Sequence, residues 1–203
     1  MHKPYYLVAL FAATLLITTA RAQTTKGTRV LGLSAGDVSY QKTDYYKRIS
    51  ATLAPSIGTF VADNVALGVN LPIGYSFVKY QDSFSSRTKQ RGLAIGLLPW
   101  LRYYLPSTSR HRFFGELSVG GVLNSNRVKP VGFAAISSNN VNLQASAGLG
   151  YTYFLAPNVG LETLLAYSHN SGTSEGFGRG SLGLNLGFRI YLPQGGATAA
   201  PTE

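Results

Sequence analysis

Eight segments of the chain alternate apolar and polar residues with a period of two, which is the pattern of β-strands. In the last segment, leucine, phenylalanine and isoleucine fill every second position, and small or polar residues fill most of the others. Each segment therefore has one apolar face, which must be buried against a second sheet or turned toward lipid. The predicted strands are Arg29–Tyr40, Lys47–Val61, Val65–Lys79, Arg91–Leu105, Phe113–Asn124, Asn140–Leu155, Val159–His169 and Ser181–Leu192.

The predicted connections between these strands alternate between long and short. Barrels that span a membrane keep short turns on one side and long loops on the other. The even strand number and this alternation predict an all-β fold, an eight-stranded antiparallel up-and-down transmembrane β-barrel, closed because lipid offers no hydrogen-bond partner to an open edge. A secreted globular sandwich is the alternative. The long connections are Gln41–Tyr46, Tyr80–Gln90, Ser125–Asn139 and Asn170–Arg179, and the short ones are Ala62-Asp63-Asn64, Pro106–Arg112 and Ala156-Pro157-Asn158.

The first residues have the pattern of a secretory signal peptide. Lys3 gives a positive start, Leu7–Thr18 is apolar but too short to span a bilayer as a helix, and Ala20-Arg21-Ala22 fits a small-x-small cleavage site. We therefore expect residues 1–22 to be removed and residues 23–203 to form the barrel domain. The chain has no cysteine, so disulfides play no part.

The end of the last strand resembles the C-terminal assembly signal of outer-membrane barrels, with Asn185, Gly187, Ile190 and Leu192 at its characteristic positions. With the eight strands, the chain resembles the outer membrane protein β-barrel domain family of Gram-negative bacteria. The resemblance implies an outer-membrane location, insertion by the barrel-assembly machinery and contact with outer-membrane lipids and lipopolysaccharide, with a monomer favoured. Members of this family have diverse roles, so the resemblance predicts a cellular location rather than an activity.

Four charged residues fall on inward faces near the predicted periplasmic ends of the strands: Arg102, Glu116, Glu162 and Arg189. The lumen of an eight-stranded barrel is just wide enough to be filled by side chains. Because an unpaired interior charge is very costly, we expect these residues to form ion pairs that plug the lumen. A proton or ion pathway is the alternative.

His169 and Ser171 stand two apart, which is the H-x-S spacing of lipid A deacylases. A histidine can activate a serine when a carboxylate orients it. Glu175 is the nearby acid, but this chain has Gly172 and Gly183 where the deacylases have asparagine and the acid. These two residues are the weak catalytic candidates, and we expect a non-enzymatic barrel with a structural, adhesive or ligand-binding role through its outer loops. The alternatives are a narrow channel for small or apolar solutes and a deacylase-like hydrolase.

The formal charge is +10, or +8 without the signal peptide, and nine basic residues are scattered over the predicted outer loops. A basic rim suits lipopolysaccharide phosphates, and plain solvated loop charge is the alternative. Nucleic-acid binding is not expected because the charge is scattered and the chain is exported. The sequence also predicts no metal site or cofactor. The basic loop residues are Lys42, Lys47, Arg48, Arg87, Lys89, Arg91, Arg127, Lys129 and Arg179.

Aromatic residues and prolines complete the pattern. Aromatics near the strand ends predict two interfacial belts, although strand propensity alone also favours them. Pro55, Pro72 and Pro99 lie mid-strand at a similar height and predict a local bulge or bend, or a broken strand. The periplasmic belt comprises Phe60, Tyr103, Tyr104, Phe113, Phe114, Tyr153, Phe154 and Tyr191, and the outer belt comprises Tyr40, Tyr75, Phe77, Tyr80 and Tyr167.

Overall fold

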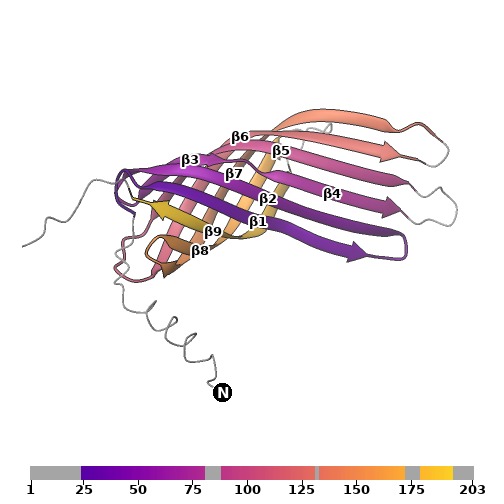
Figure 1. Ribbon diagram of the computed structural model, residues 1–203. Coiled ribbons are helices and arrows are strands. Elements are labelled where there is room, and N and C mark those ends of the chain that lie inside the picture. Colours follow the sequence, from indigo (N-terminus) through magenta and orange to yellow (C-terminus); the bar gives the residue numbers. More distant parts are fainter. Residues whose placement is uncertain (1–23, 81–87, 131–132, 172–178, 194–203) are drawn as a thin grey trace, which may run out of the picture.

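The computed structural model describes residues 24–80, 88–130, 133–171 and 179–193. The predicted signal peptide lies outside these residues. The strands pair antiparallel in chain order, and β1 pairs with β9, so the sheet closes into a ring (Figure 1). The strands are β1 (Arg29–Lys42), β2 (Tyr46–Ala62), β3 (Val65–Asn70), β4 (Ile73–Tyr80), β5 (Lys89–Tyr104), β6 (His111–Lys129), β7 (Ile136–Ala156), β8 (Val159–Ser171) and β9 (Arg179–Leu192).

Strands β3 and β4 are two parts of one predicted strand. Both pair with β2 and with β5, and the register on either side of the break is the same. The ladder is interrupted at Leu71 and Pro72 because proline has no backbone N–H to donate. The ring therefore contains eight antiparallel strands, which confirms the predicted fold class.

The three mid-strand prolines lie at a similar height, but none of them marks a bulge, and at Pro72 the strand is interrupted, which was the alternative. Leu71 N–H donates to the Pro55 carbonyl, and Gly96 N–H donates to the Pro72 carbonyl, each at 2.9 Å. Pairing between β5 and β6 pauses at Pro99 and resumes in the same register. Each proline removes one backbone N–H from the ladder without shifting the register, so no extra residue forms a bulge. Register shifts occur instead between Gly36 and Ser39, Phe60 and Ala62, and Phe154 and Ala156.

The outer surface of the ring is apolar. Leu117 is 57% exposed and Leu149 is 77% exposed, while their inward neighbours Ser118 and Gly150 are buried. A continuous apolar exterior around the ring is unfavourable in water and matches the lipid-facing band of a transmembrane barrel. In the part of the chain that the structure describes, no helix has the length and apolar character needed to cross a membrane.

The strands extend beyond the predicted ends into segments that the sequence predicted as loops. The predicted loop Ser125–Asn139 contracts to residues 130–135, and Gln41–Tyr46 contracts to residues 43–45. These segments are polar on both faces and therefore lack the alternation that marks a strand, but their backbones still pair. The expected alternation of long and short connections is not strict, since residues 105–110 form a longer connection than residues 43–45.

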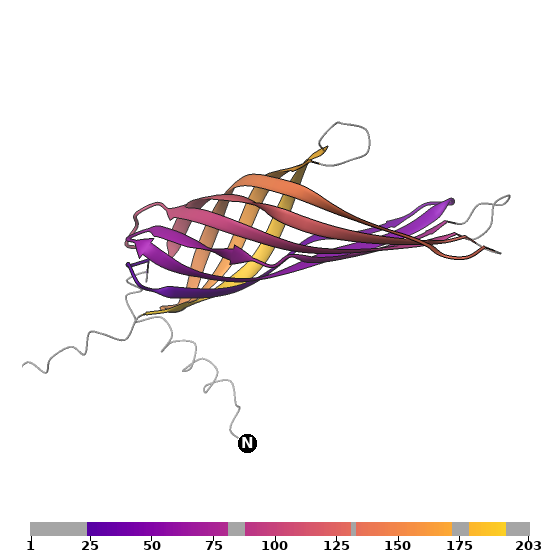
Figure 2. The same cartoon turned by 90° about the horizontal axis from the view of Figure 1, so that it is seen from above.

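The ring is closed along only part of its length. At the end that carries residues 43–45 and 130–135, β1 and β9 separate. Pairing of β1 with β9 ends at Gly36 and Asn185, although β1 continues along β2 to Lys42 and β9 continues along β8 to Arg179. Asp37 has a φ of 52° at the bulge where the two strands part. Figure 2 shows the neighbouring ends of β8 and β9 diverging from the long extension formed by β1, β2 and β4–β7.

Candidate functional site

Four charged side chains meet inside the ring near the β2–β3, β5–β6 and β7–β8 turns. Arg102 Nη2 lies 2.6 Å from Glu116 Oε2, and Arg102 Nη1 lies 2.7 Å from Glu162 Oε2. Arg189 Nε lies 2.7 Å from Glu162 Oε2, and its Nη2 lies 3.9 Å from Glu116 Oε2. All four residues are more than nine-tenths buried. Two positive and two negative charges thus balance within one network.

Strand register explains two of these contacts. Arg102 lies directly opposite Glu116 across β5 and β6. Glu162 on β8 lies opposite Gly187 on β9, so Arg189 is its diagonal neighbour. The contact between Arg102 and Glu162 joins β5 to β8, which are not neighbours, and it forms only because the ring closes.

Uncharged groups complete the hydrogen bonding of Glu162. Its Oε1 accepts from Thr152 Oγ1 at 3.1 Å and from the Tyr191 hydroxyl at 3.0 Å. The Tyr104 hydroxyl accepts from Arg102 Nη1 at 3.0 Å and lies 3.0 Å from the Tyr191 hydroxyl. Both carboxylate oxygens therefore have partners, as a buried charge requires.

A layer of aromatic rings lies between the charged cluster and the short turns. Neighbouring rings in this layer have centroids 5.0 to 6.3 Å apart, and all are almost fully buried. The Arg102 guanidinium also lies 3.7 Å from the centre of the Phe114 ring, a cation–π contact. The layer consists of Phe60, Tyr104, Phe114, Phe154 and Tyr191.

This layer corrects the predicted periplasmic belt. Five of the eight aromatics assigned to that belt point into the lumen. Several of them are adjacent in sequence, as in Tyr103-Tyr104 and Phe113-Phe114, and a period of two sends one of each pair inward. Tyr103 and Phe113 remain exposed on the outer surface.

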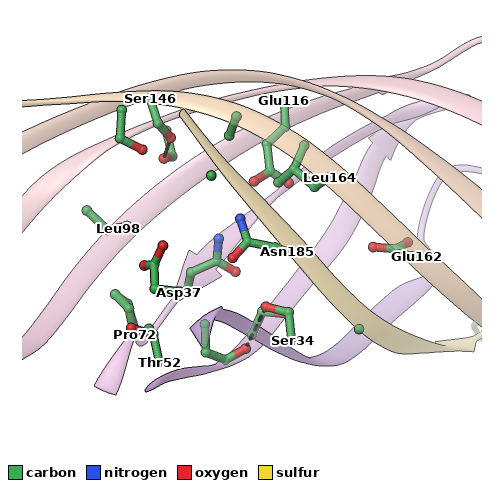
Figure 3. Close-up of a pocket in the computed structure, with 18 of the residues that line it drawn as sticks. Ser34, Asp37, Thr52, Pro72, Leu98, Glu116, Ser146, Glu162, Leu164 and Asn185 are labelled. Carbon is green, nitrogen blue, oxygen red and sulfur yellow. Dashed lines mark hydrogen bonds between the residues drawn. The ribbon is translucent and has the colours of Figure 1, made fainter. Parts of the chain in front are cut away.

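Beyond the charged cluster, the lumen contains a cavity of about 210 Å³ (Figure 3). Its walls carry mainly hydroxyl and amide groups, including those of Ser34, Thr52, Ser146 and Asn185, which Figure 3 labels. The charged cluster closes one end of this cavity. Asp37 lines it near the point where β1 and β9 part.

His169 and Ser171 lie at the far end of β8, away from the charged cluster. Both residues are exposed, and His169 lines a depression of the outer surface with Tyr167 and Leu117. The Ser171 hydroxyl donates to the Leu143 carbonyl at 3.2 Å. Glu175 lies outside the described residues. The structure thus shows a serine bonded to the backbone on the apolar face, without a catalytic arrangement among the described side chains.

The residues of the resembled assembly signal divide between the two faces of β9. Asn185 and Gly187 face the lumen, where both line the cavity. Ile190 and Leu192 lie on the opposite face and pair with Leu31 and Arg29 of β1. The closing β1–β9 seam therefore runs through this segment.

Sequence reasoning missed the groups that support the charged cluster. Thr152, Tyr104 and Tyr191 fall on inward positions of their strands, so a strict period of two could have identified them. Trp100 was also missed, although it is the only tryptophan and is 2% exposed. Among the described residues, no group of three or more His, Asp or Glu side chains is arranged to hold a metal ion.

Comparison with known proteins identifies the fold. No protein-family model and no curated protein sequence matches the chain. A major outer membrane protein from Thermus thermophilus matches with a TM-score of 0.50 and 16% identity, over 81% of this chain and 99% of that one. OprG from Pseudomonas aeruginosa matches at 0.48 and 13%, over 85% and 100%. Ail of Yersinia pestis matches at 0.48 and 12%, over 82% and 100%.

The strand order, the closed ring and the apolar exterior agree with the Thermus thermophilus similarity, which covers most of the chain. The chain therefore has the fold of the small outer-membrane β-barrels.

Proposed function

We propose that this chain is an integral outer-membrane protein that is neither an enzyme nor an open pore, and that its role is structural, adhesive or ligand-binding. The apolar exterior and the fold support insertion in a membrane. The expected signal peptide and C-terminal assembly signal support export to the outer membrane. The long hairpins of β1–β2, β4–β5 and β6–β7 are the surface available for binding.

The closed end of the lumen is the observation that carries this proposal. Arg102, Glu116, Glu162 and Arg189 span the lumen, with an aromatic layer beneath them. A hydrated ion would have to separate ion pairs that are buried and fully hydrogen-bonded at Glu162. Leaving either partner unpaired in this position is strongly unfavourable.

In planar bilayers, the purified protein is expected to show no stable conducting state. A gel that distinguishes folded from heat-unfolded protein should first show that the barrel has folded, and a general porin provides the positive control for insertion. A reproducible conductance level that scales with the amount of inserted protein would contradict the closed lumen.

The opening between β1 and β9 favours a second candidate function, a lateral path for small apolar solutes. It adjoins the cavity, and a Cβ added at Gly183 would lie 3.5 Å from Asp37 Oδ1. Cysteines at these two positions, D37C and G183C, can therefore be joined by a short cross-linker in this cysteine-free chain. Uptake of a small apolar solute by protein-containing vesicles, blocked by the cross-link, would favour this function over a closed barrel.

Hydrolase activity is the least supported candidate. The Ser171 hydroxyl donates to a backbone carbonyl, and His169 lies on the apolar exterior. A nucleophilic serine would instead need a hydrogen bond to the histidine, which a carboxylate then orients.

A further inference from the structure

Five lysines form one row across the outer ends of the strands. Lys42 lies directly opposite Lys47, and Lys47 opposite Lys79. Lys79 lies opposite Lys89, and Lys89 opposite Lys129. The row therefore crosses β1, β2, β4, β5 and β6, and we call it the lysine row.

The lysine row lies on the same face as the apolar exterior. Along β5, this face carries Leu93, then Arg91, then Lys89, because alternate residues share a face. Arg91 lies opposite Arg127 of β6, so two arginines lie between the lysine row and the aliphatic surface. Aliphatic residues followed by cations with long apolar stems match the change from hydrocarbon to headgroups at a membrane surface.

The cations of the lysine row have no acidic partner among the described residues. The ion pairs found in that part of the chain all belong to the lumen cluster. Like charges directly opposite each other on neighbouring strands repel. Anions from outside the described chain would therefore stabilise a row of this kind.

The length of β5 places the lysine row at the level of lipid headgroups. Tyr103, exposed near one end of β5, and Lys89 near the other are fourteen residues apart. At roughly 3.3 Å per residue this is about 46 Å along the strand. A tilt of about 35–45° reduces it to roughly 33–38 Å, which exceeds an apolar band of about 25 Å. With Tyr103 at one interface, Lys89 thus lies beyond the opposite edge of the hydrocarbon.

We propose that the lysine row, with Arg91 and Arg127, binds the phosphate groups of lipopolysaccharide in the surrounding outer leaflet. This inference rests on the proposed outer-membrane location.

The lysine row differs from the basic rim of loops that the sequence predicted. Arg48 lies opposite Val78, between Lys47 and Ile49, and so faces away from the row, while Lys79 was not among the loop cations. Arg87 and the side chain of Arg179 lie outside the described part of the chain.

The test compares lipid binding by the folded protein in neutral detergent. The probe is bisphosphorylated lipid A, with the same lipid lacking its phosphates as the reference. The triple variant K47Q, K79Q and K89Q is expected to bind the phosphorylated lipid about tenfold more weakly, because each basic residue near an anionic surface contributes favourably. The matched control R48Q removes a charge from the opposite face of the same strand and should retain wild-type affinity.

Two further measurements keep this inference falsifiable. The wild-type protein should prefer phosphorylated lipid A, and free pyrophosphate should not compete at the same concentration, since the row is positioned for lipids in the leaflet. Equal affinity of the triple variant and wild type, or effective competition by pyrophosphate, would overturn the proposal. If the triple variant does not fold, the test is wild-type binding of lipid A with and without its phosphates. Equal affinity for the two lipids would then overturn the proposal.

The outcome is separate from that of the proposed function. A conducting barrel that prefers phosphorylated lipid would contradict only the closed lumen. A non-conducting barrel without this preference would contradict only the lysine row.

Discussion

Replacing Glu162 with glutamine is expected to destabilise the folded barrel by about 3–5 kcal/mol, because removing one partner of a buried ion pair leaves uncompensated charge. Glu162 Oε2 accepts from both Arg102 and Arg189 at 2.7 Å, and all three residues are at least nine-tenths buried. E162Q would thus leave two arginines facing a single remaining carboxylate. Unfolding by denaturant in lipid vesicles, followed by the fluorescence of Trp100, measures the loss.

Two variants give the matched controls for this result. E116Q should destabilise less, since Glu116 has one close partner, Arg102, and that arginine would keep its bond to Glu162. D44N changes an exposed residue in the β1–β2 turn and should leave the free energy of unfolding unchanged. Equal stability of E162Q and wild type would contradict a stabilising role for the buried cluster.

Replacing Trp100 with alanine is expected to destabilise the barrel by about 3–5 kcal/mol, as for other large buried aromatic residues. Trp100 lies opposite Gly68, which lies opposite Gly58, so the indole covers two glycines on neighbouring strands. A Cβ added at Gly68 would lie 2.3 Å from Trp100 Cζ2. Thermal unfolding followed by circular dichroism is the suitable measurement, since the variant lacks the fluorescent residue.

Phenylalanine at the same position should cost less than alanine, because it keeps an aromatic ring in the lumen and leaves a smaller cavity. Trp100 Nε1 is buried without a hydrogen-bond partner in the described structure. W100F removes that unsatisfied donor while keeping an aromatic ring over the glycines. A loss as large for W100F as for W100A would mean that the full indole, rather than any aromatic ring, is needed over these glycines.

The alternation of residue types was sufficient to predict that four charged side chains enter the lumen. Arg102, Glu116, Glu162 and Arg189 each sit on the small and polar face of a strand, and the structure places all four inside the ring. Their number and sign already indicated a balanced cluster. The contact between Arg102 and Glu162 could not be predicted, because it depends on the width of the closed ring rather than on the register of neighbours.

The outer ends of the strands were harder to predict. Residues 124–128 pair with residues 136–140, yet their mostly polar side chains form no continuous apolar face. Backbone pairing does not need a hydrophobic face where both sides are solvated, so the hydrophobic pattern ended before the strands did. For the same reason, four members of the lysine row were assigned to a basic rim of loops, and only the register aligns them with Lys79.

The leucine-rich faces of the strands should contact lipid. Because the chain has no cysteine, single cysteines carrying an environment-sensitive fluorophore can be placed at Leu117 and at its neighbour Ser118. In vesicles containing lipids with a quencher on the acyl chain, fluorophores at L117C should be strongly quenched and those at S118C protected. Equal quenching at both sites, or stronger quenching at S118C, would contradict the account.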